Sequence, residues 1–136
     1  MRLGGRWVID THIPESGALT PGSVDDSFAR ARQVFGTHFA DLPAEELHCR
    51  SWLLDPQLAE VLPGESNMVR FQRRWELYGD ADLGDDDAVF FVFRRRDTTA
   101  DSRAALPRST TLQRAILERI EAGGHWQLRH GRIPLT

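Results

Sequence analysis

The sequence predicts an α+β domain in which two main helices pack on a mostly antiparallel sheet of about five strands. Three observations point to this class. The chain has 136 residues, of which 40% are hydrophobic and 27% charged, and this fits one domain over residues 1–136. Segments with strand periodicity alternate with segments of helical periodicity in the order β-α-β-β-β-α-β. No repeat or long linker divides the chain.

The first two elements are a strand and a helix. Residues 6–13 are rich in β-branched and aromatic side chains and stop at Pro14, which predicts a strand. After a turn, Thr20 and Pro21 have the form of an N-cap followed by proline at the first helical position. Apolar residues then recur at helical spacing, which predicts an amphipathic helix over residues 21–39. Its apolar stripe is Val24, Phe28, Ala31, Phe35 and Phe39.

The middle of the chain predicts a strand at residues 47–54, a short helix from Asp55 through Leu62, and a strand at residues 67–78. The last strand is expected because apolar and polar side chains alternate along it, which gives one buried and one polar face. Its apolar side chains are Val69, Phe71, Trp75 and Leu77, and its polar ones include Arg70, Gln72, Arg74 and Glu76.

Residues 79–87 are expected to form a turn whose five aspartates contact solvent. Residues 88–95 are apolar on both faces, which predicts a central strand flanked by the strand at 67–78. Residues 96–109 then form a loop long enough to suggest a functional role.

The last third of the chain predicts a helix and a final strand. The helix begins at Thr110 and Thr111 and ends at Gly123 and Gly124. Its apolar stripe is Leu112, Ile116 and Ile120. The final strand covers residues 125–128 or slightly more, and a turn at His130 and Gly131 is an alternative to a longer strand.

Composition excludes several classes of function. No apolar run approaches the ~20 residues that span a bilayer, and no apolar signal core is present, so we expect a cytoplasmic protein without membrane contact. A net charge of −3 argues against nucleic acid as a partner. All 17 basic residues are arginine, which excludes lysine Schiff-base chemistry. Five histidines without metal-ligand spacing and one cysteine predict neither a metal site nor a disulfide.

His12 is the candidate catalytic base, because it stands at a strand end where side chains project into a cleft. Asp10, two residues earlier on the same face, would orient its ring. A histidine that only caps the turn is the alternative. His48 and Cys49 are neighbours on a strand and point to opposite faces, so they cannot form a nucleophile–base pair. Cys49 is expected in the core, and the histidines other than His12 are expected to be exposed or hydrogen-bonded.

Two groups of side chains suit an anion. The polar face of the 67–78 strand carries two guanidinium groups separated by an amide, which could bind a carboxylate or a phosphate, or could simply be solvated. These residues are Arg70, Gln72 and Arg74. Arg108 precedes the free N–H groups and the hydroxyls of Thr110 and Thr111 at the start of the last helix, which suits a phosphate. Helix capping alone is the alternative there.

Four stretches together resemble one known family: residues 11–17, 49–58, 66–74 and 106–114. They are similar to the C-terminal GNAT-like domain of bacterial acyltransferase-domain proteins, and the resemblance covers nearly the whole chain. It implies a GNAT-like enzyme that transfers an acyl group from acyl-CoA or acetyl-CoA to a small-molecule amine or hydroxyl. The implied contacts of the CoA pyrophosphate are Arg108, Thr110 and Thr111. The residues expected to contact the small-molecule substrate are Trp52, Arg70, Gln72 and Arg74.

Two alternatives to this function stay open. The loop at residues 96–109 contains none of the glycines that typical GNAT phosphate loops carry, so a catalytically silent binding or assembly domain is one. A GNAT-derived enzyme that works without CoA through His12 is the other. Members of the family also carry a mainly helical region ahead of this domain. The expected partners are therefore that N-terminal region or a second copy of the chain.

Overall fold

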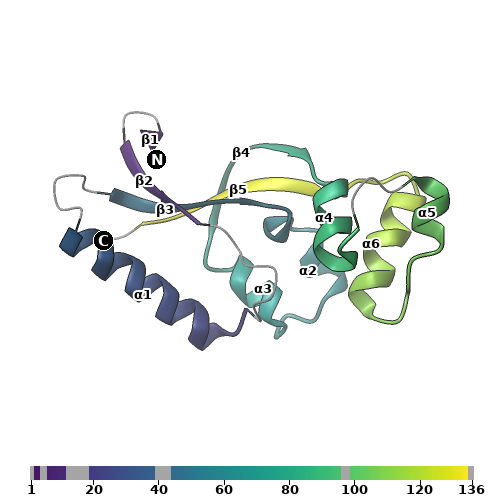
Figure 1. Cartoon of the computed structure of the whole chain (residues 1–136), viewed down its shortest axis with the longest axis horizontal. Helices are drawn as coiled ribbons and strands as arrows, with labels where there is room; N and C mark the ends of the chain where they lie inside the picture. Colours follow the sequence, from purple (N-terminus) through teal and green to yellow (C-terminus); the bar gives the residue numbers. More distant parts are fainter. Residues whose placement is uncertain (1, 4–5, 12–18, 39–43, 96–98, 135–136) are drawn as a thin grey trace.

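A computed structural model describes residues 2–3, 6–11, 19–38, 44–95 and 99–134 (Figure 1). The predicted α+β class is confirmed, with one five-stranded sheet and helices packed against it. In chain order the elements are β1 (Arg2–Leu3), β2 (Arg6–Asp10), α1 (Pro21–His38), β3 (Ala44–Ser51), the 3-10 helix η1 (Trp52–Leu54), α2 (Leu58–Val61), α3 (Asn67–Gln72), β4 (Glu76–Leu83), α4 (Asp85–Phe93), α5 (Ala100–Ala104), α6 (Thr111–Glu121) and β5 (Gln127–Pro134).

The strands lie in the order β1-β2-β3-β5-β4. Only the β2–β3 pair is parallel among the described strands, so the sheet is mainly antiparallel, as predicted. The strand β5 lies between β3 and β4 and is central. The two-residue strand β1, which we did not predict, pairs with the beginning of β2.

The first half of the sheet and α1 share one hydrophobic core, called here the α1 core. It comprises Ile9, Val24, Phe28, Leu47, Cys49, Leu54, Phe71 and Trp75. The predicted helix over 21–39 is confirmed through His38, and Val24 and Phe28 are buried as expected. Figure 1 shows α1 and α3 on the same face of the sheet. The Phe35 side chain and Phe39 lie outside the described part of the chain.

A second core, the α6 core, lies where α4 and α6 meet the other end of the sheet (Figure 1). It comprises Trp52, Leu53, Leu58, Ala88, Val89, Ile116, Trp126 and Leu128. The predicted helix from Thr110 is confirmed as α6, with Ile116 fully buried and Leu112 and Ile120 half-buried. The helix η1 joins the two cores, because Leu54 packs in one while its neighbours Trp52 and Leu53 pack in the other.

The strand predicted at 47–54 starts and ends earlier, as β3. The hydroxyl of Ser51 accepts a hydrogen bond from the Leu53 N–H at 3.1 Å, and this cap begins η1 and ends the strand. The short helix expected from Asp55 is present as α2, and a carboxylate oxygen of Asp55 accepts from the Gln57 N–H at 2.9 Å.

The strand predicted at 67–78 is wrong in its first half, because residues 67–72 form α3. The Ser66 hydroxyl caps this helix by accepting from the Val69 N–H, a signal that outweighs the apolar–polar alternation. Phe71 and Trp75 are both buried, and their spacing of four residues is also a helical spacing. Only residues 76–78 of the predicted segment belong to a strand, and β4 continues from them to Leu83.

The turn predicted at 79–87 and the central strand predicted at 88–95 are also wrong. Residues 85–93 form α4, whose first turn holds Asp85, Asp86 and Asp87. Carboxylates are stabilising at a helix N-terminus, where the backbone N–H groups carry partial positive charge. A short run that is apolar on both faces fits a buried helix as well as a buried strand, so periodicity could not separate the two.

The end of the chain differs from prediction in two details. The predicted loop at 96–109 contains the short helix α5, which Thr99 caps by accepting from the Ser102 N–H, while residues 96–98 lie outside the described ranges. The final strand is one continuous strand, β5, with no turn at His130. Among the described helices, none is long and apolar enough to cross a membrane.

Candidate functional site

The N-terminus of α6, where the phosphate site was predicted, is closed by its own cap. The Thr110 hydroxyl accepts from the Gln113 N–H at 3.0 Å, and the Gln113 side chain accepts from the Thr110 N–H at 3.1 Å and the Ser109 N–H at 2.8 Å. This capping box uses three of the donors that an anion could otherwise bind. In the described part of the chain, the N–H groups of Thr111 and Leu112 donate no hydrogen bond.

Arg108 does not direct its charge to this N-terminus. Its guanidinium pairs with the Glu121 carboxylate at 2.6 Å, on the last turn of α6. The hydrogen bond from Arg108 lowers the pKa of Glu121 below its ordinary value. The cation at the start of α6 is instead Arg114, which sequence reasoning missed. It donates to the carbonyls of Arg108 and Ser109 at 3.1 and 3.2 Å and to the Thr111 hydroxyl at 3.4 Å. Its position three residues after Thr111, on one helix face, was the available signal.

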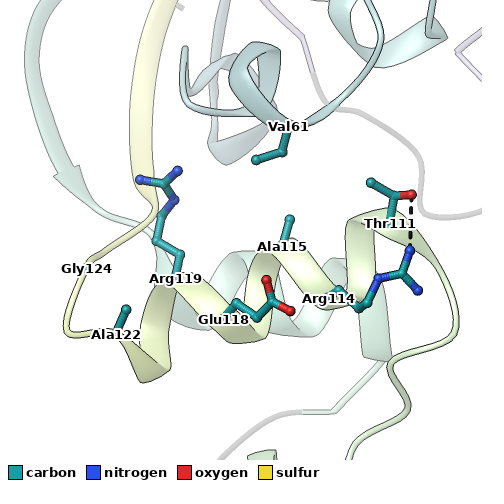
Figure 2. Close-up of a pocket in the computed structure, with 8 residues that line it drawn as sticks. All are labelled: Val61, Thr111, Arg114, Ala115, Glu118, Arg119, Ala122 and Gly124. Carbon is teal, nitrogen blue, oxygen red and sulfur yellow. Dashed lines mark hydrogen bonds between the residues drawn. The ribbon is translucent and has the colours of Figure 1, made fainter.

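A groove of about 600 Å³ follows the exposed side of α6 (Figure 2). Its lining is Val61, Thr111, Arg114, Ala115, Glu118, Arg119, Ala122 and Gly124. Small side chains at Ala115 and Ala122 and the absence of one at Gly124 leave this space between α6 and Val61 of α2. Figure 2 shows Arg114 at the Thr111 end of the groove and Arg119 near the other end.

Arg119 holds α2 against α6. Its guanidinium donates to the Gln57 side chain and lies 3.4 Å from the Glu60 carboxylate. The same guanidinium stacks 5.1 Å from the ring centre of Trp126. The Arg119 guanidinium is therefore already paired within the protein. At this end of the groove we assign Arg119 a structural role and not a ligand-binding one.

A second polar cluster lies on the face of the sheet opposite the α1 core. Leu47 and Cys49 point into that core, so His48 between them points to the other face. The His48 ring lies 5.4 Å from the Tyr78 ring and 5.6 Å from the His130 ring, and the last two lie 5.8 Å apart. We call these three residues with Asp10 the His48 cluster. The Asp10 carboxylate lies 3.8 Å from Nδ1 of His48.

His48 is 4% exposed, and neither ring nitrogen makes a hydrogen bond within the described residues. The expectation of an exposed or hydrogen-bonded histidine is therefore wrong at this position. Burial, and next the neighbouring His130, lower the pKa of His48 below its ordinary value, while the charges of Asp10 and Glu46 act in the opposite direction. A pKa below the ordinary value means that His48 is neutral near neutral pH.

Cys49 lies in the core, as the sequence predicted, and Asp10 lies at the end of β2. Cys49 is buried in the α1 core, and burial raises its pKa to about 12, which makes the thiol unreactive. Asp10 is at the end of β2 and is partly exposed. The next residue, Thr11, donates its N–H to the His48 carbonyl at 2.7 Å and so fixes this strand end beside β3. His12, the candidate base, lies outside the described residues.

The four residues suggested for substrate contact do not form one row. Trp52 is buried in the α6 core. Gln72, on α3, donates to the carbonyls of Leu53 and Asp55 at 2.8 and 2.7 Å. The row expected from a strand is wrong because α3 and the turn after it turn these side chains in different directions.

The two arginines of that group have separate acidic partners. Arg70 pairs with Glu65 at 2.5 Å, and both side chains are largely exposed. Arg74 pairs with Asp25 of α1 at 2.5 Å and also donates to the Pro21 carbonyl at 3.2 Å. Arg74 therefore ties the turn after α3 to the first turn of α1. Within the described residues, no group of three or more His, Cys, Asp or Glu side chains could hold a metal ion.

The chain matches the model of the family described as "GNAT-like C-terminal domain" over residues 2–133. It therefore belongs to the family of GNAT-like C-terminal domains, and the fold resemblance drawn from the sequence is confirmed. Among curated proteins, no sequence matches the chain significantly.

Several solved structures are similar to the chain. One is the crystal structure of an acyltransferase in complex with decanoyl-CoA, at 40% identity and a TM-score of 0.87 over 97% of this chain and 41% of that one. A mutant acyltransferase in complex with octanoyl-CoA is 36% identical, with a TM-score of 0.83 over 93% of this chain and 40% of that one. An acyltransferase in complex with decanoyl-CoA and teicoplanin is 37% identical, with a TM-score of 0.82 and the same coverage. The chain thus spans about two fifths of these proteins.

Proposed function

We propose that the chain is the GNAT-like domain of an acyltransferase that moves an acyl group from acyl-CoA to an amine or hydroxyl of a small molecule. The observation that carries this proposal is the match over 97% of the chain to an acyltransferase in complex with decanoyl-CoA. A small-molecule acceptor is supported by the related acyltransferase in complex with teicoplanin. The remaining three fifths of such proteins have no counterpart in this chain, so a further N-terminal region is part of the proposal.

The proposed CoA site is the start of α6 and the groove beside it. Support comes from the N–H groups of Thr111 and Leu112 and from the Arg114 guanidinium, which together suit a pyrophosphate. Arg108 reaches the same phosphates only if it leaves Glu121, and Thr110 contributes through the cap that orders the helix start. The groove of about 600 Å³ could hold the remainder of the CoA molecule.

Asp10 and His12 remain the proposed catalytic residues, and the partly exposed Asp10 carboxylate supports this assignment. Acceptor binding remains the proposed role of Trp52, Arg70, Gln72 and Arg74, of which Arg70 is the most accessible.

Calorimetric titration with CoA and decanoyl-CoA tests the proposed CoA site. We expect the chain to bind both ligands, and we expect Arg114→Ala to weaken binding about 10- to 150-fold, the range of one charge-assisted hydrogen bond. Arg108→Ala should weaken binding less, because the Arg108 guanidinium is paired with Glu121. Arg30→Ala is the matched control, because Arg30 is an exposed arginine of α1. The affinity of this variant for CoA should stay within about twofold of the parent's. Absence of binding up to millimolar ligand would favour the silent binding or assembly domain.

A further inference from the structure

The His48 cluster contains a polar group whose burial needs an explanation. Buried side-chain nitrogens almost always have a hydrogen-bond partner, because leaving one without a partner costs free energy. Both ring nitrogens of His48 lack one among the described residues, although Asp10 lies only 3.8 Å away. Catalytic hydrogen bonds are often long in the absence of substrate and shorten in the reacting complex. A shift of about 1 Å would join Nδ1 to the Asp10 carboxylate.

The backbone holds this pair firmly. Asp10 and His48 are register partners on the parallel strands β2 and β3 and therefore lie on the same face of the sheet. The Thr11 N–H donates to the His48 carbonyl directly beyond this pair. Catalytic groups on strands are held more precisely than groups on loops.

The exposure of the two groups suggests a division of work. The Asp10 side chain is 36% exposed and can meet a substrate, whereas the His48 side chain is 6% exposed and lies behind it. A carboxylate alone is a weak base near neutral pH, but a neutral imidazole beside it can take over the proton that the carboxylate collects. The other titratable or charged groups on this face come from every neighbouring strand and include Glu46 and Arg50 of β3, Glu76, Tyr78 and Asp82 of β4, and His130 and Arg132 of β5.

We propose that Asp10 and His48 form a proton relay for the acyl transfer proposed above, with Asp10 contacting the acceptor and His48 storing its proton. In this step the acceptor N–H or O–H bond breaks as nitrogen or oxygen bonds to the acyl carbon. The C–S bond of acyl-CoA breaks at the same time. The proton passes through Asp10 to His48 and returns through Asp10 to the departing thiolate, because His48 lies behind Asp10, so the products are the acylated acceptor and CoA as a thiol. Asp10 is the catalytic residue and His48 a positioning residue.

The pH dependence of acyl transfer tests the relay. In the parent chain, kcat/KM should fall on acidification only below about pH 6.5, the ordinary pKa of histidine, because His48 must be neutral. We expect His48→Gln and Asp10→Asn to lower kcat about 10²- to 10⁴-fold and to remove this acid limb, with KM for acyl-CoA within threefold. Asp26→Asn is the matched control: it changes an exposed aspartate of α1, which packs on the opposite face of the sheet, and should leave kcat unchanged.

Two results would overturn the relay. One is a kcat within threefold of the parent in His48→Gln with the acid limb intact, which would leave His12 as the base. The other is a parallel loss of CoA binding and thermal stability in that variant, which would make His48 structural.

A second measurement needs no activity. In an NMR titration, the pKa of His48 should lie below its ordinary value and should fall further in Asp10→Asn, because the Asp10 charge raises it. An unchanged pKa of His48 in Asp10→Asn would show that Asp10 and His48 do not interact. If the parent neither binds CoA nor transfers an acyl group, the proposed function fails, while this titration still decides whether the pair exists.

Discussion

The α1 core and the α6 core are held together in different ways. The α1 core is an ordinary contact between a helix and a sheet, with aromatic rings such as Phe28 and Trp75 meeting edge to face at 5.8 Å. The α6 core also contains buried Trp126 and Ile116, but hydrogen bonds from polar groups hold its elements in place. The Trp126 ring N–H donates to the Ile116 carbonyl at 3.1 Å.

Two aspartates hold the start of β5 in the α6 core. The fully buried Asp55 accepts from the Gln127 N–H at 2.8 Å and from the Gln57 side chain at 2.8 Å. Asp85 accepts from the Trp126 N–H at 2.7 Å and pairs with His125 at 2.6 Å. Apolar packing thus suffices where a helix lies on a sheet, whereas the irregular junction of η1, α4 and β5 needs directed hydrogen bonds. We expect the α6 core to depend more on individual polar side chains.

The largest expected effect is that of Trp126→Ala. This change removes a fully buried ring, its contact with Trp52 at 6.2 Å and its stacking with Arg119. We expect the free energy of unfolding to fall by about 3–5 kcal/mol, from lost burial and a residual cavity. Urea denaturation measures it, with the exposed Leu83→Ala as control at about 0.5 kcal/mol or less. A loss below about 1 kcal/mol would show that Trp126 is not central to this core.

Asp55→Ala should come next. It leaves the N–H groups of Gln57 and Gln127 without their carboxylate acceptor. An unsatisfied buried donor costs about 1–3 kcal/mol, and the same denaturation measurement reports it. Asp80→Ala, which changes an exposed aspartate of β4, should change stability by about 0.5 kcal/mol at most. Equal effects of the two changes would mean that polar groups do not distinguish the α6 core.

The rate at which a thiol reagent labels Cys49 tests whether the α1 core and the α6 core unfold together. In the folded chain the thiol is buried with a pKa of about 12, so labelling at pH 8 should require opening of the α1 core. Because η1 contributes to both cores, we expect Trp126→Ala to speed the labelling of Cys49 about 10²-fold or more, in line with the lost stability. An unchanged rate would show that the α1 core opens independently.

The parts of the fold that the sequence predicted are those with a local signal. Thr20 with Pro21 and Thr110 with Thr111 stand in front of amphipathic helices, and both helices are present where expected. The prediction for residues 67–95 was wrong in most of its length, because α3 and α4 have short apolar patterns that also fit strands. There the decisive signals were the Ser66 cap and the three aspartates, which were interpreted as solvent contacts.

The candidate site was predictable only in part. Asp10 and the start of α6 could be proposed from the sequence because each stands at the end of an element with a clear pattern, and their roles stay predictions. The approach of His48 to His130 could not be predicted from the sequence, because it depends on which strands become neighbours. In the sequence, 82 positions separate the two residues. The pairing of Arg108 with Glu121 was missed for a similar reason, since it depends on the path of the segment before α6.

The position of β5 between β3 and β4 also bears on how the chain folds during synthesis. Residues 127–134 are translated after every other described element, yet they supply the hydrogen bonds that join β3 to β4. Until they leave the ribosome, β3 and β4 each have an edge without this partner, and exposed strand edges are prone to aggregate. The sheet can therefore be completed only after residues 127–134 have been made, and slow emergence of these residues from the ribosome would extend the period at risk.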